Sequence, residues 1–200
     1  MTGVASNRLQ RRPLVLSLPN VLTYARILAV PAVVGFLYFM PGHTGRWIAL
    51  GIYVAACITD WLDGFLARIW EQQSNLGRML DPIADKLLVG ATLLMLTYEN
   101  TISGLSLWAA VVILCREILV SGLREFLAEL NVKVHVTRLA KWKTTLQMVA
   151  LGVLIAGAAG DAVLPGTTTT GLALLWLAAL LTLWTGYDYL KAGVRHAIDS

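Results

Sequence analysis

Charged residues are scarce in this chain. Asp, Glu, Lys and Arg make up 14% of its 200 residues, whereas about 25% is usual in soluble domains. Hydrophobic residues account for 57% of the sequence, the mean hydropathy is +0.68, and seven tryptophans are present. This balance excludes an ordinary soluble domain and predicts an integral membrane protein.

Cysteine is also rare. The two cysteines, Cys57 and Cys115, lie in separate apolar runs, and their spacing fits neither a disulfide framework nor a Cys/His metal site. We interpret both as small core residues. The sequence contains no long linker, low-complexity tract or internal repeat, so we expect one membrane domain that covers residues 1–200.

Hydropathy predicts the fold class, an all-α integral membrane protein with a six-helix transmembrane bundle over residues 21–190. An apolar run of about 20 residues is long enough to cross a bilayer. The expected spans are roughly 21–40, 47–68, 79–98, 104–123, 144–160 and 172–190. We expect residues 1–20 to be a cytoplasmic segment whose last part lies at the membrane interface. A signal peptide is the alternative, but no small-residue cleavage site follows the first run.

The basic residues orient the expected bundle. Of the sixteen Lys and Arg residues, only Arg46 lies in a connection after the first, third or fifth span. The positive-inside rule therefore places both termini in the cytoplasm. The ionisable residues of the spans gather toward the same side, and the opposite halves are almost entirely apolar. We therefore expect a polar active-site cavity that opens to the cytoplasm.

Four aspartates form a regular pattern in residues 60–85. Asp60 and Asp63 are three residues apart on one expected helix, and Asp81 and Asp85 are four apart on the next, so each pair shares a helix face. Four carboxylates close together repel one another unless cations lie between them. Oxygen ligands favour hard divalent ions such as Mg²⁺. The pattern therefore predicts a site for two divalent ions, an arrangement suited to phosphoryl transfer.

Structural explanations exist for parts of this pattern. Asp81 followed by Pro82 is typical of a helix N-terminus, and an isolated Asp-x-x-Asp is usually a solvated helix face. Neither explanation accounts for the whole pattern. Its remaining members are Gly64, Ala67, Arg68 and Gly77.

The full pattern, Asp-x2-Asp-Gly-x2-Ala-Arg-x8-Gly-x3-Asp-x3-Asp, resembles the signature of the CDP-alcohol phosphotransferase family at all eight positions. Members of that family are membrane enzymes that move a phosphoalcohol from a CDP-linked donor to an acceptor hydroxyl, using divalent metal. The resemblance is strong over 60–85, weaker at 20–26 and 116–147, and limited to hydropathy in the last fifty residues. It implies that two Mg²⁺ or Mn²⁺ ions bind the four aspartates, and that Asp85 is also the catalytic base.

The wider sequence resembles the family members that use CDP-diacylglycerol as donor and glycerol-3-phosphate as acceptor. The resemblance implies that the CDP-lipid is bound by Asn20, Thr23, Arg26, Gly64, Ala67, Arg68, Ser74 and Gly77. The implied acceptor-phosphate site consists of Arg116, Arg124, Lys141, Lys143, Thr144 and Gln147. It further implies a homodimer in the bacterial cytoplasmic (inner) membrane, in contact with membrane lipids and without a nucleic acid partner.

Three other functions share some of these features. A CDP-lipid transferase for serine, inositol phosphate or phosphatidylglycerol would carry the same aspartates. A membrane prenyltransferase also binds diphosphates through aspartates and Mg²⁺, but its acidic motifs would lie on well-separated helices. A divalent-cation transporter would need polar sites near the membrane midplane and a route to the far side, and the apolar outer halves of the expected spans offer neither.

Overall fold

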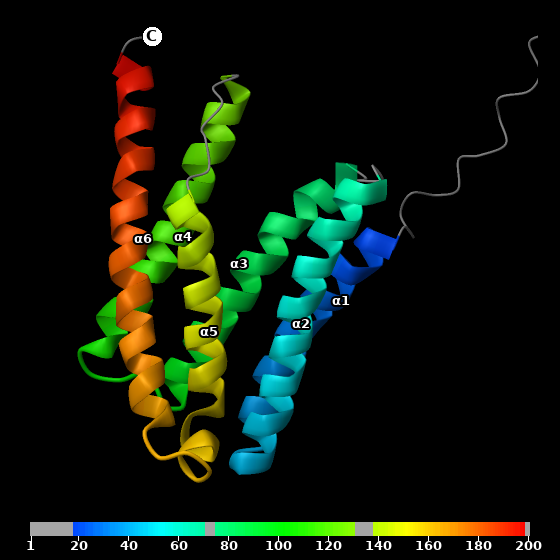
Figure 1. Cartoon of the computed structure of the whole chain (residues 1–200), viewed down its shortest axis with the longest axis vertical. Coiled ribbons are helices and arrows are strands. Elements are labelled where there is room, and N and C mark those ends of the chain that lie inside the picture. The colour runs from blue at the N-terminus through cyan, green and yellow to red at the C-terminus, as the bar shows by residue number, and fades with distance from the viewer. Residues whose placement is uncertain (1–17, 71–74, 131–137, 199–200) are drawn as a thin grey trace, which may run out of the picture.

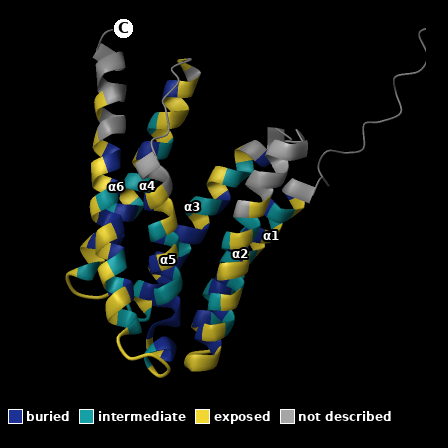
Figure 2. Cartoon of the chain, viewed as in Figure 1, coloured by how far each residue is buried: buried dark blue, intermediate teal, exposed yellow. Residues whose placement is uncertain are grey.

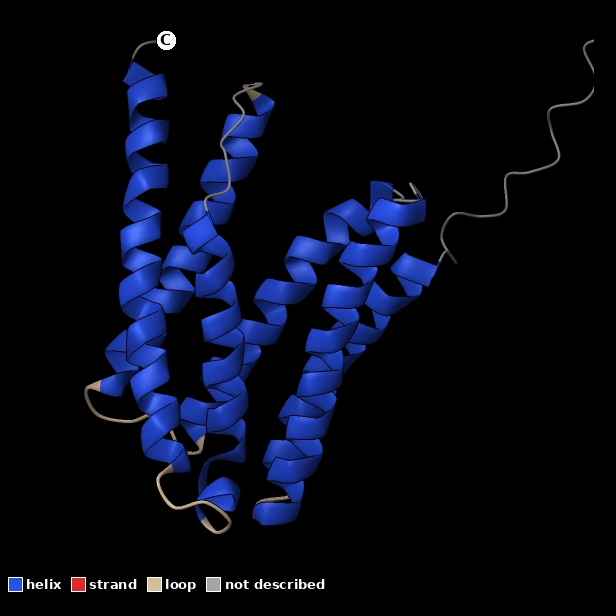
Figure 3. Cartoon of the chain, viewed as in Figure 1, coloured by secondary structure: helices blue, strands red, loops and turns tan. Residues whose placement is uncertain are grey.

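The fold is built from six α-helices. The computed structural model describes residues 18–70, 75–130 and 138–198. The helices are α1 (Leu18–Phe39), α2 (His43–Trp70), α3 (Asn75–Tyr98), α4 (Ser106–Glu129), α5 (Arg138–Asp161) and α6 (Thr167–Ile198). They run alternately up and down, and the described ranges contain no strand (Figures 1 and 3). The all-α prediction is confirmed.

Four of these helices are long and apolar enough to cross a membrane. The candidate segments, in α1, α4, α5 and α6, are Asn20–Phe39, Ser106–Ala128, Trp142–Asp161 and Thr167–Tyr187. α2 and α3 have 28 and 24 residues, which at about 1.5 Å per residue exceeds a hydrocarbon thickness of about 30 Å. The aspartate pattern interrupts their apolar runs, so composition alone does not mark them as spans. The six-span bundle therefore stays a prediction.

The connection between the last two helices is shorter than expected. α5 continues to Asp161 and α6 begins at Thr167, whereas the expected spans ended at 160 and began at 172. α3 begins at Asn75 and includes Pro82 in its interior. Asp81 is therefore not the N-cap of α3, and its place inside the helix removes the structural explanation for that aspartate.

The helices pack as two groups that meet in an apolar core. α1 packs against α2 and α3, α6 packs against α4 and α5, and α2 contacts α5 (Figure 1). The core includes Leu37, Tyr53, Leu88, Leu154 and Leu175, all fully buried. Exposed positions recur along the helices (Figure 2), and they include large apolar residues such as Leu28, Leu94, Trp108 and Trp184. An apolar exterior of this kind is expected of helices that face lipid.

The two ends of the bundle differ in content. α1 begins, α2 ends, α3 begins and α6 ends at one end, which we call the aspartate end because residues 60–85 lie there (Figure 1). The opposite end carries the connections at 40–42, 99–105 and 162–166. Both ends of the described chain thus lie at the aspartate end, as an even number of antiparallel helices requires.

Arg46 is held inside the bundle at the opposite end. Its Nη2 donates to Glu99 Oε2 at 2.8 Å and to Thr101 Oγ1 at 2.7 Å. Its Nη1 donates to the backbone carbonyls of Leu154 at 3.3 Å and Ile155 at 3.1 Å. Burial raises the pKa of the Glu99 carboxyl, and the Arg46 guanidinium opposes part of that shift. Arg46 is therefore a paired interior charge, which explains why it is the exception to the distribution of basic residues.

The Arg46 contact coincides with a break in α5. Gly157 has φ +40° and ψ −122°, a conformation outside the helical region, and a helix break frees carbonyl groups in the turn before it. The guanidinium supplies donors to two carbonyls of that turn. A Cβ at position 157 would lie 2.3 Å from Arg46 Nη1. Position 157 therefore favours glycine for two reasons, its positive φ and the close approach of the Arg46 guanidinium.

We predict that Gly157→Ala destabilises the protein, because an alanine is strained in this conformation by about 1–3 kcal/mol and displaces Arg46. Thermal unfolding of purified protein in detergent, followed by tryptophan fluorescence, would show a lower midpoint. Gly152→Ala in the same helix is the matched control, since its Cβ would meet Tyr53 at an ordinary 3.7 Å. Equal midpoints for Gly157→Ala and the wild type would contradict this account of the break.

Candidate functional site

Arg26 joins two of the predicted metal ligands. Its Nη2 lies 2.9 Å from Asp60 Oδ1, and its Nη1 lies 2.9 Å from Asp85 Oδ1. The Arg26 side chain is fully buried, whereas the two carboxylates are 39% and 43% exposed. The guanidinium of α1 thus connects α2 to α3, and the accessible sides of both carboxylates remain open to a ligand.

A second contact between α1 and α3 lies one turn away. Thr23 Oγ1 donates to Asp81 Oδ1 at 2.5 Å. Asn20, Thr23 and Arg26 follow one another at steps of three and are all buried, at 1% exposure each, so α1 presents a polar stripe toward the aspartates. Gly77, one turn before Asp81, is buried as well. The structure therefore brings two of the predicted CDP-lipid residues, Thr23 and Arg26, into contact with the aspartates.

Some predicted site residues cannot be placed. Ser74 lies outside the described residues. The helix backbone includes five other predicted positions whose side chains lie outside the described part of the chain, and these are Asp63, Gly64, Ala67, Arg68 and Lys141. The roles proposed for these residues stay predictions.

The donor set of the aspartate cluster fits a hard divalent cation. Two carboxylates, those of Asp60 and Asp85, share the single positive charge of Arg26, and Asp81 lies one turn before Asp85 on α3. Among the side chains that the structure describes, no three His, Cys, Asp or Glu residues hold an ion-sized site as they stand. Arg26 takes up contacts of Asp60 and Asp85 that an ion would use. An ion would therefore share or replace those contacts, and the oxygen chemistry suits Mg²⁺ or Mn²⁺.

A cavity of about 760 Å³ lies beside the aspartates. This volume is within the range usual for small-molecule sites. Cys57, Asp60 and Asp85 line one side of it, from α2 and α3. On the other side, from α4 and α5, its lining includes Arg116, Arg124, Thr144 and Gln147. Residues from both predicted sites, the metal site and the acceptor-phosphate site, therefore line one cavity.

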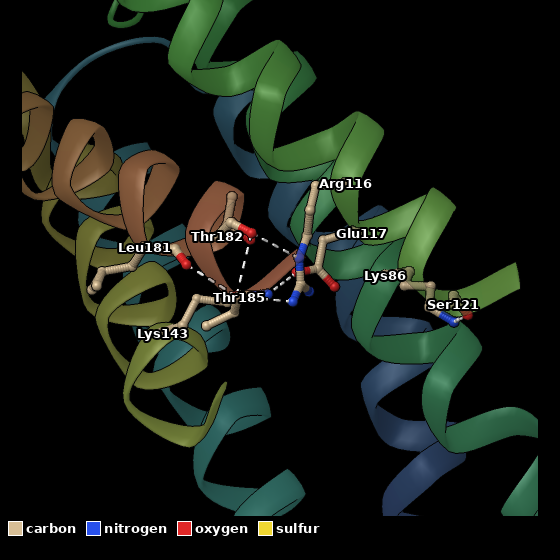
Figure 4. A network of polar contacts seen from close by, with 8 residues as sticks. All are labelled: Lys86, Arg116, Glu117, Ser121, Lys143, Leu181, Thr182 and Thr185. Carbon is tan, nitrogen blue, oxygen red and sulfur yellow. Dashed lines mark hydrogen bonds and ion pairs between the residues drawn. The ribbon is translucent and has the colours of Figure 1, made fainter. Parts of the chain in front are cut away.

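Arg116 is positioned by α6. Its Nε donates to the Thr182 carbonyl at 3.2 Å and its Nη2 to Thr185 Oγ1 at 3.1 Å, and its Nη1 lies 3.3 Å from Glu117 Oε1 (Figure 4). Gly186 allows the close approach of the two helices, since a Cβ there would lie 3.3 Å from Arg116 Cγ. The orientation of this guanidinium therefore depends on the packing of α4 against α6.

Lys143 is linked to Arg116 through the carboxylate of Glu117. Its ammonium pairs with Glu117 Oε1, the oxygen that Arg116 also contacts. Lys143 is 3% exposed and is not part of the cavity lining, whereas Glu117 is part of it. One carboxylate thus links cations from α4 and α5. Arg116 and Lys143 are brought together as predicted, with Glu117 between them.

Lys86 and Ser121 also line the cavity, and neither was predicted as a site residue. The Lys86 ammonium donates to Ser121 Oγ (Figure 4). Ser121 Oγ in turn donates to Glu125 Oε1 at 3.4 Å. Lys86 directly follows Asp85, so its place beside the aspartate pattern was an available signal. Ser121 lies in a mostly apolar stretch of α4 and offered none.

Comparisons with known proteins identify the family. The sequence model of the family described as CDP-alcohol phosphatidyltransferase matches residues 16–184. A CDP-diacylglycerol–glycerol-3-phosphate 3-phosphatidyltransferase of Rickettsia typhi is 45% identical over 176 residues, which cover 88% of this chain and 96% of the relative. A protein of the same name from Cereibacter sphaeroides is 40% identical over 217 residues, covering 92% and 98%.

A plant relative has a different name. A protein of Oryza sativa subsp. japonica named cardiolipin synthase (CMP-forming) is 42% identical over 193 residues, which cover 90% of this chain and 58% of the relative. The family match begins before α1 and reaches into α6, so it extends far beyond the aspartate pattern and confirms the resemblance found in the sequence. The chain belongs to the CDP-alcohol phosphatidyltransferase family.

Proposed function

We propose that this enzyme transfers the phosphatidyl group from CDP-diacylglycerol to glycerol-3-phosphate, which gives phosphatidylglycerol phosphate and CMP. The observation that carries the proposal is the cavity in which Asp60 and Asp85 face Arg116 and Arg124. Aspartates suit a metal-bound diphosphate, and arginines suit the phosphate of the acceptor. Bacterial relatives with this named activity match nearly the whole chain at 40% and 45% identity.

The chemistry is a substitution at the phosphorus atom that bears the diacylglycerol. Asp85 takes the proton from the acceptor hydroxyl, the hydroxyl oxygen forms the new bond to phosphorus, and the diphosphate bond breaks so that CMP leaves with the electron pair. Arg26 holds the Asp60 and Asp85 carboxylates in position. Two Mg²⁺ or Mn²⁺ ions bound by the four aspartates would neutralise the diphosphate and stabilise the charge that develops.

The basic residues of α4 and α5 would bind the acceptor phosphate, which carries up to two negative charges. Arg124 is exposed and lines the cavity, so its guanidinium is available to a ligand from that side. Arg116 is held by α6, and Lys143 is held by Glu117. Lys141 and Lys143 are two residues apart in the sequence, and residues at that spacing do not share a helix face, so we expect only one of them to reach the phosphate.

A second candidate acceptor is phosphatidylglycerol, and the observation that favours it is the rice relative named cardiolipin synthase (CMP-forming). The deciding experiment incubates purified protein with CDP-diacylglycerol, Mg²⁺ and one acceptor at a time, and measures CMP release and the lipid product. The acceptors are glycerol-3-phosphate, phosphatidylglycerol, serine and inositol phosphate. We expect CMP release with glycerol-3-phosphate. Turnover with phosphatidylglycerol alone would assign the enzyme to cardiolipin synthesis instead.

We predict that Arg124→Ala raises the KM for glycerol-3-phosphate about tenfold, with little change in the KM for CDP-diacylglycerol. A charge-assisted contact contributes about 1.5–3 kcal/mol, and the exposure of Arg124 places it at the low end of that range. Lys191→Ala is the matched control, because Lys191 is an exposed cation of α6 that does not line the cavity. An unchanged acceptor KM in Arg124→Ala would remove Arg124 from the acceptor site.

A separate prediction concerns the aspartates and the metal. Asp85→Asn removes a ligand charge and the base, and loss of a general base alone lowers rates by about 10²–10⁴, so turnover should fall at least that far. Excess chelator should abolish wild-type activity, and Mg²⁺ or Mn²⁺ should restore it. Asp161→Asn, at the opposite end of α5, is the control and should stay active. Full activity in chelator would rule out the metal, whereas a near-normal Asp85→Asn enzyme would rule out only the base.

We also propose that all six helices cross the bacterial cytoplasmic membrane, with both termini and the aspartate end in the cytoplasm. The distribution of basic residues supports this orientation. The family resemblance further favours a homodimer. Light scattering of the detergent-solubilised protein tests the dimer, since one chain has a mass of 21.8 kDa, and a protein mass of one chain would contradict it.

The orientation predicts which introduced cysteines an impermeant thiol reagent labels in intact cells. With Cys57 and Cys115 replaced by serine, Val163→Cys should be labelled and Leu130→Cys should be labelled only after the membrane is opened. Val163 is 75% exposed in the connection before α6, and Leu130 is 49% exposed at the end of α4. The reverse labelling pattern would place the aspartate end outside the cell and contradict the proposal.

A further inference from the structure

Gln147 is a residue of the cavity lining that carries a buried polar atom without a hydrogen-bond partner among the described residues. Its side chain is 2% exposed, and its Oε1 has no hydrogen-bond partner among the described residues. Thr92 and Thr182 also have buried side-chain oxygens without a partner there, but neither lines the cavity, whereas Gln147 does. Buried polar atoms are nearly always satisfied by protein, water or ligand. A ligand bound in this cavity would supply the hydrogen-bond donor that Gln147 Oε1 lacks.

The chemistry of an amide limits what this partner is. Oε1 can only accept a hydrogen bond, and a phosphate oxygen of a dianion can only accept as well. A hydroxyl group both donates and accepts, so it can pair with the amide in either orientation of its oxygen and nitrogen. Gln147 lies one helical turn beyond Lys143 on α5. It is thus placed next to the cationic group and is suited to a neighbouring hydroxyl of the same ligand.

We infer that Gln147 accepts a hydrogen bond from the acceptor hydroxyl that does not react. This inference rests on the proposed function, in which glycerol-3-phosphate has three polar parts. The phosphate is bound by cations, the C1 hydroxyl attacks near Asp85, and the C2 hydroxyl needs a partner of its own. Gln147 supplies that partner, and it thereby selects a phosphate that carries two hydroxyls over one that carries only the reacting hydroxyl.

The test compares glycerol-3-phosphate with 3-hydroxypropyl phosphate, which retains the reacting hydroxyl and the phosphate but lacks the C2 hydroxyl. A site built to bind a hydroxyl discriminates against an analogue without it, so we expect the wild type to use the analogue with a kcat/KM roughly 5- to 100-fold lower. Gln147→Met keeps the side-chain length without the amide. In this variant the ratio of kcat/KM for glycerol-3-phosphate to kcat/KM for the analogue should fall close to one. The change should lie mainly in the acceptor KM, and the KM for CDP-diacylglycerol should stay unchanged.

Thr145→Val is the matched control, since Thr145 lies on the same helix and also lines the cavity, and it should keep the wild-type ratio. If Gln147→Met does not fold, Gln147→Asn shortens the amide by one methylene and should also reduce the ratio. A wild-type ratio of one, or an unchanged ratio in the folded variant, would overturn the role of Gln147 while leaving the transferase intact. Failure of the wild type to release CMP with glycerol-3-phosphate would overturn the proposed function itself, and this inference with it.

Discussion

The pairing of Arg26 with Asp60 and Asp85 organises the aspartate end of this protein. The guanidinium is fully buried, and it pairs with one carboxylate on each of the two aspartate-bearing helices. Removing one partner of a buried ion pair costs about 3–5 kcal/mol, an upper bound here because the carboxylates are partly exposed. The contact therefore links stability to the proposed function, since a residue that joins the three helices also holds Asp85, the proposed base, in position.

The same physical constraint shapes the rest of the bundle. A charge in a medium of low dielectric constant must be paired, and each cation that is buried in the described part of the chain has partners from other segments. Arg46 bonds to Glu99 at the opposite end, and Lys143 pairs with Glu117 beside the cavity. The apolar core lies between these groups. Polar contacts therefore specify how the helices are registered, while apolar burial supplies most of the surface removed from solvent.

The sequence could predict features that depend on local spacing. The steps of three and four placed Asp60 and Asp85 on faces of consecutive helices, and the structure brings these faces together on Arg26. Hydropathy located six helices but not their packing partners. The contact of Arg116 with Thr185 spans 69 residues, and it depends on α4 packing against α6, a choice that no local pattern encodes. The lack of a hydrogen-bond partner for Gln147 Oε1 among the described residues also depends on how the helices pack, so no local sequence pattern could predict it.

Charge around the cavity bears on the choice of acceptor. Away from the aspartates, the lining residues and their partner Lys143 provide four cations against two carboxylates. These groups are Lys86, Arg116, Arg124, Lys143, Glu117 and Glu125. The net charge of this group is therefore +2. A phosphate monoester dianion neutralises it, whereas the single negative charge of a phosphodiester or the zero net charge of serine does not. Electrostatic complementarity therefore favours glycerol-3-phosphate over phosphatidylglycerol as the acceptor, for a reason independent of the names of the relatives.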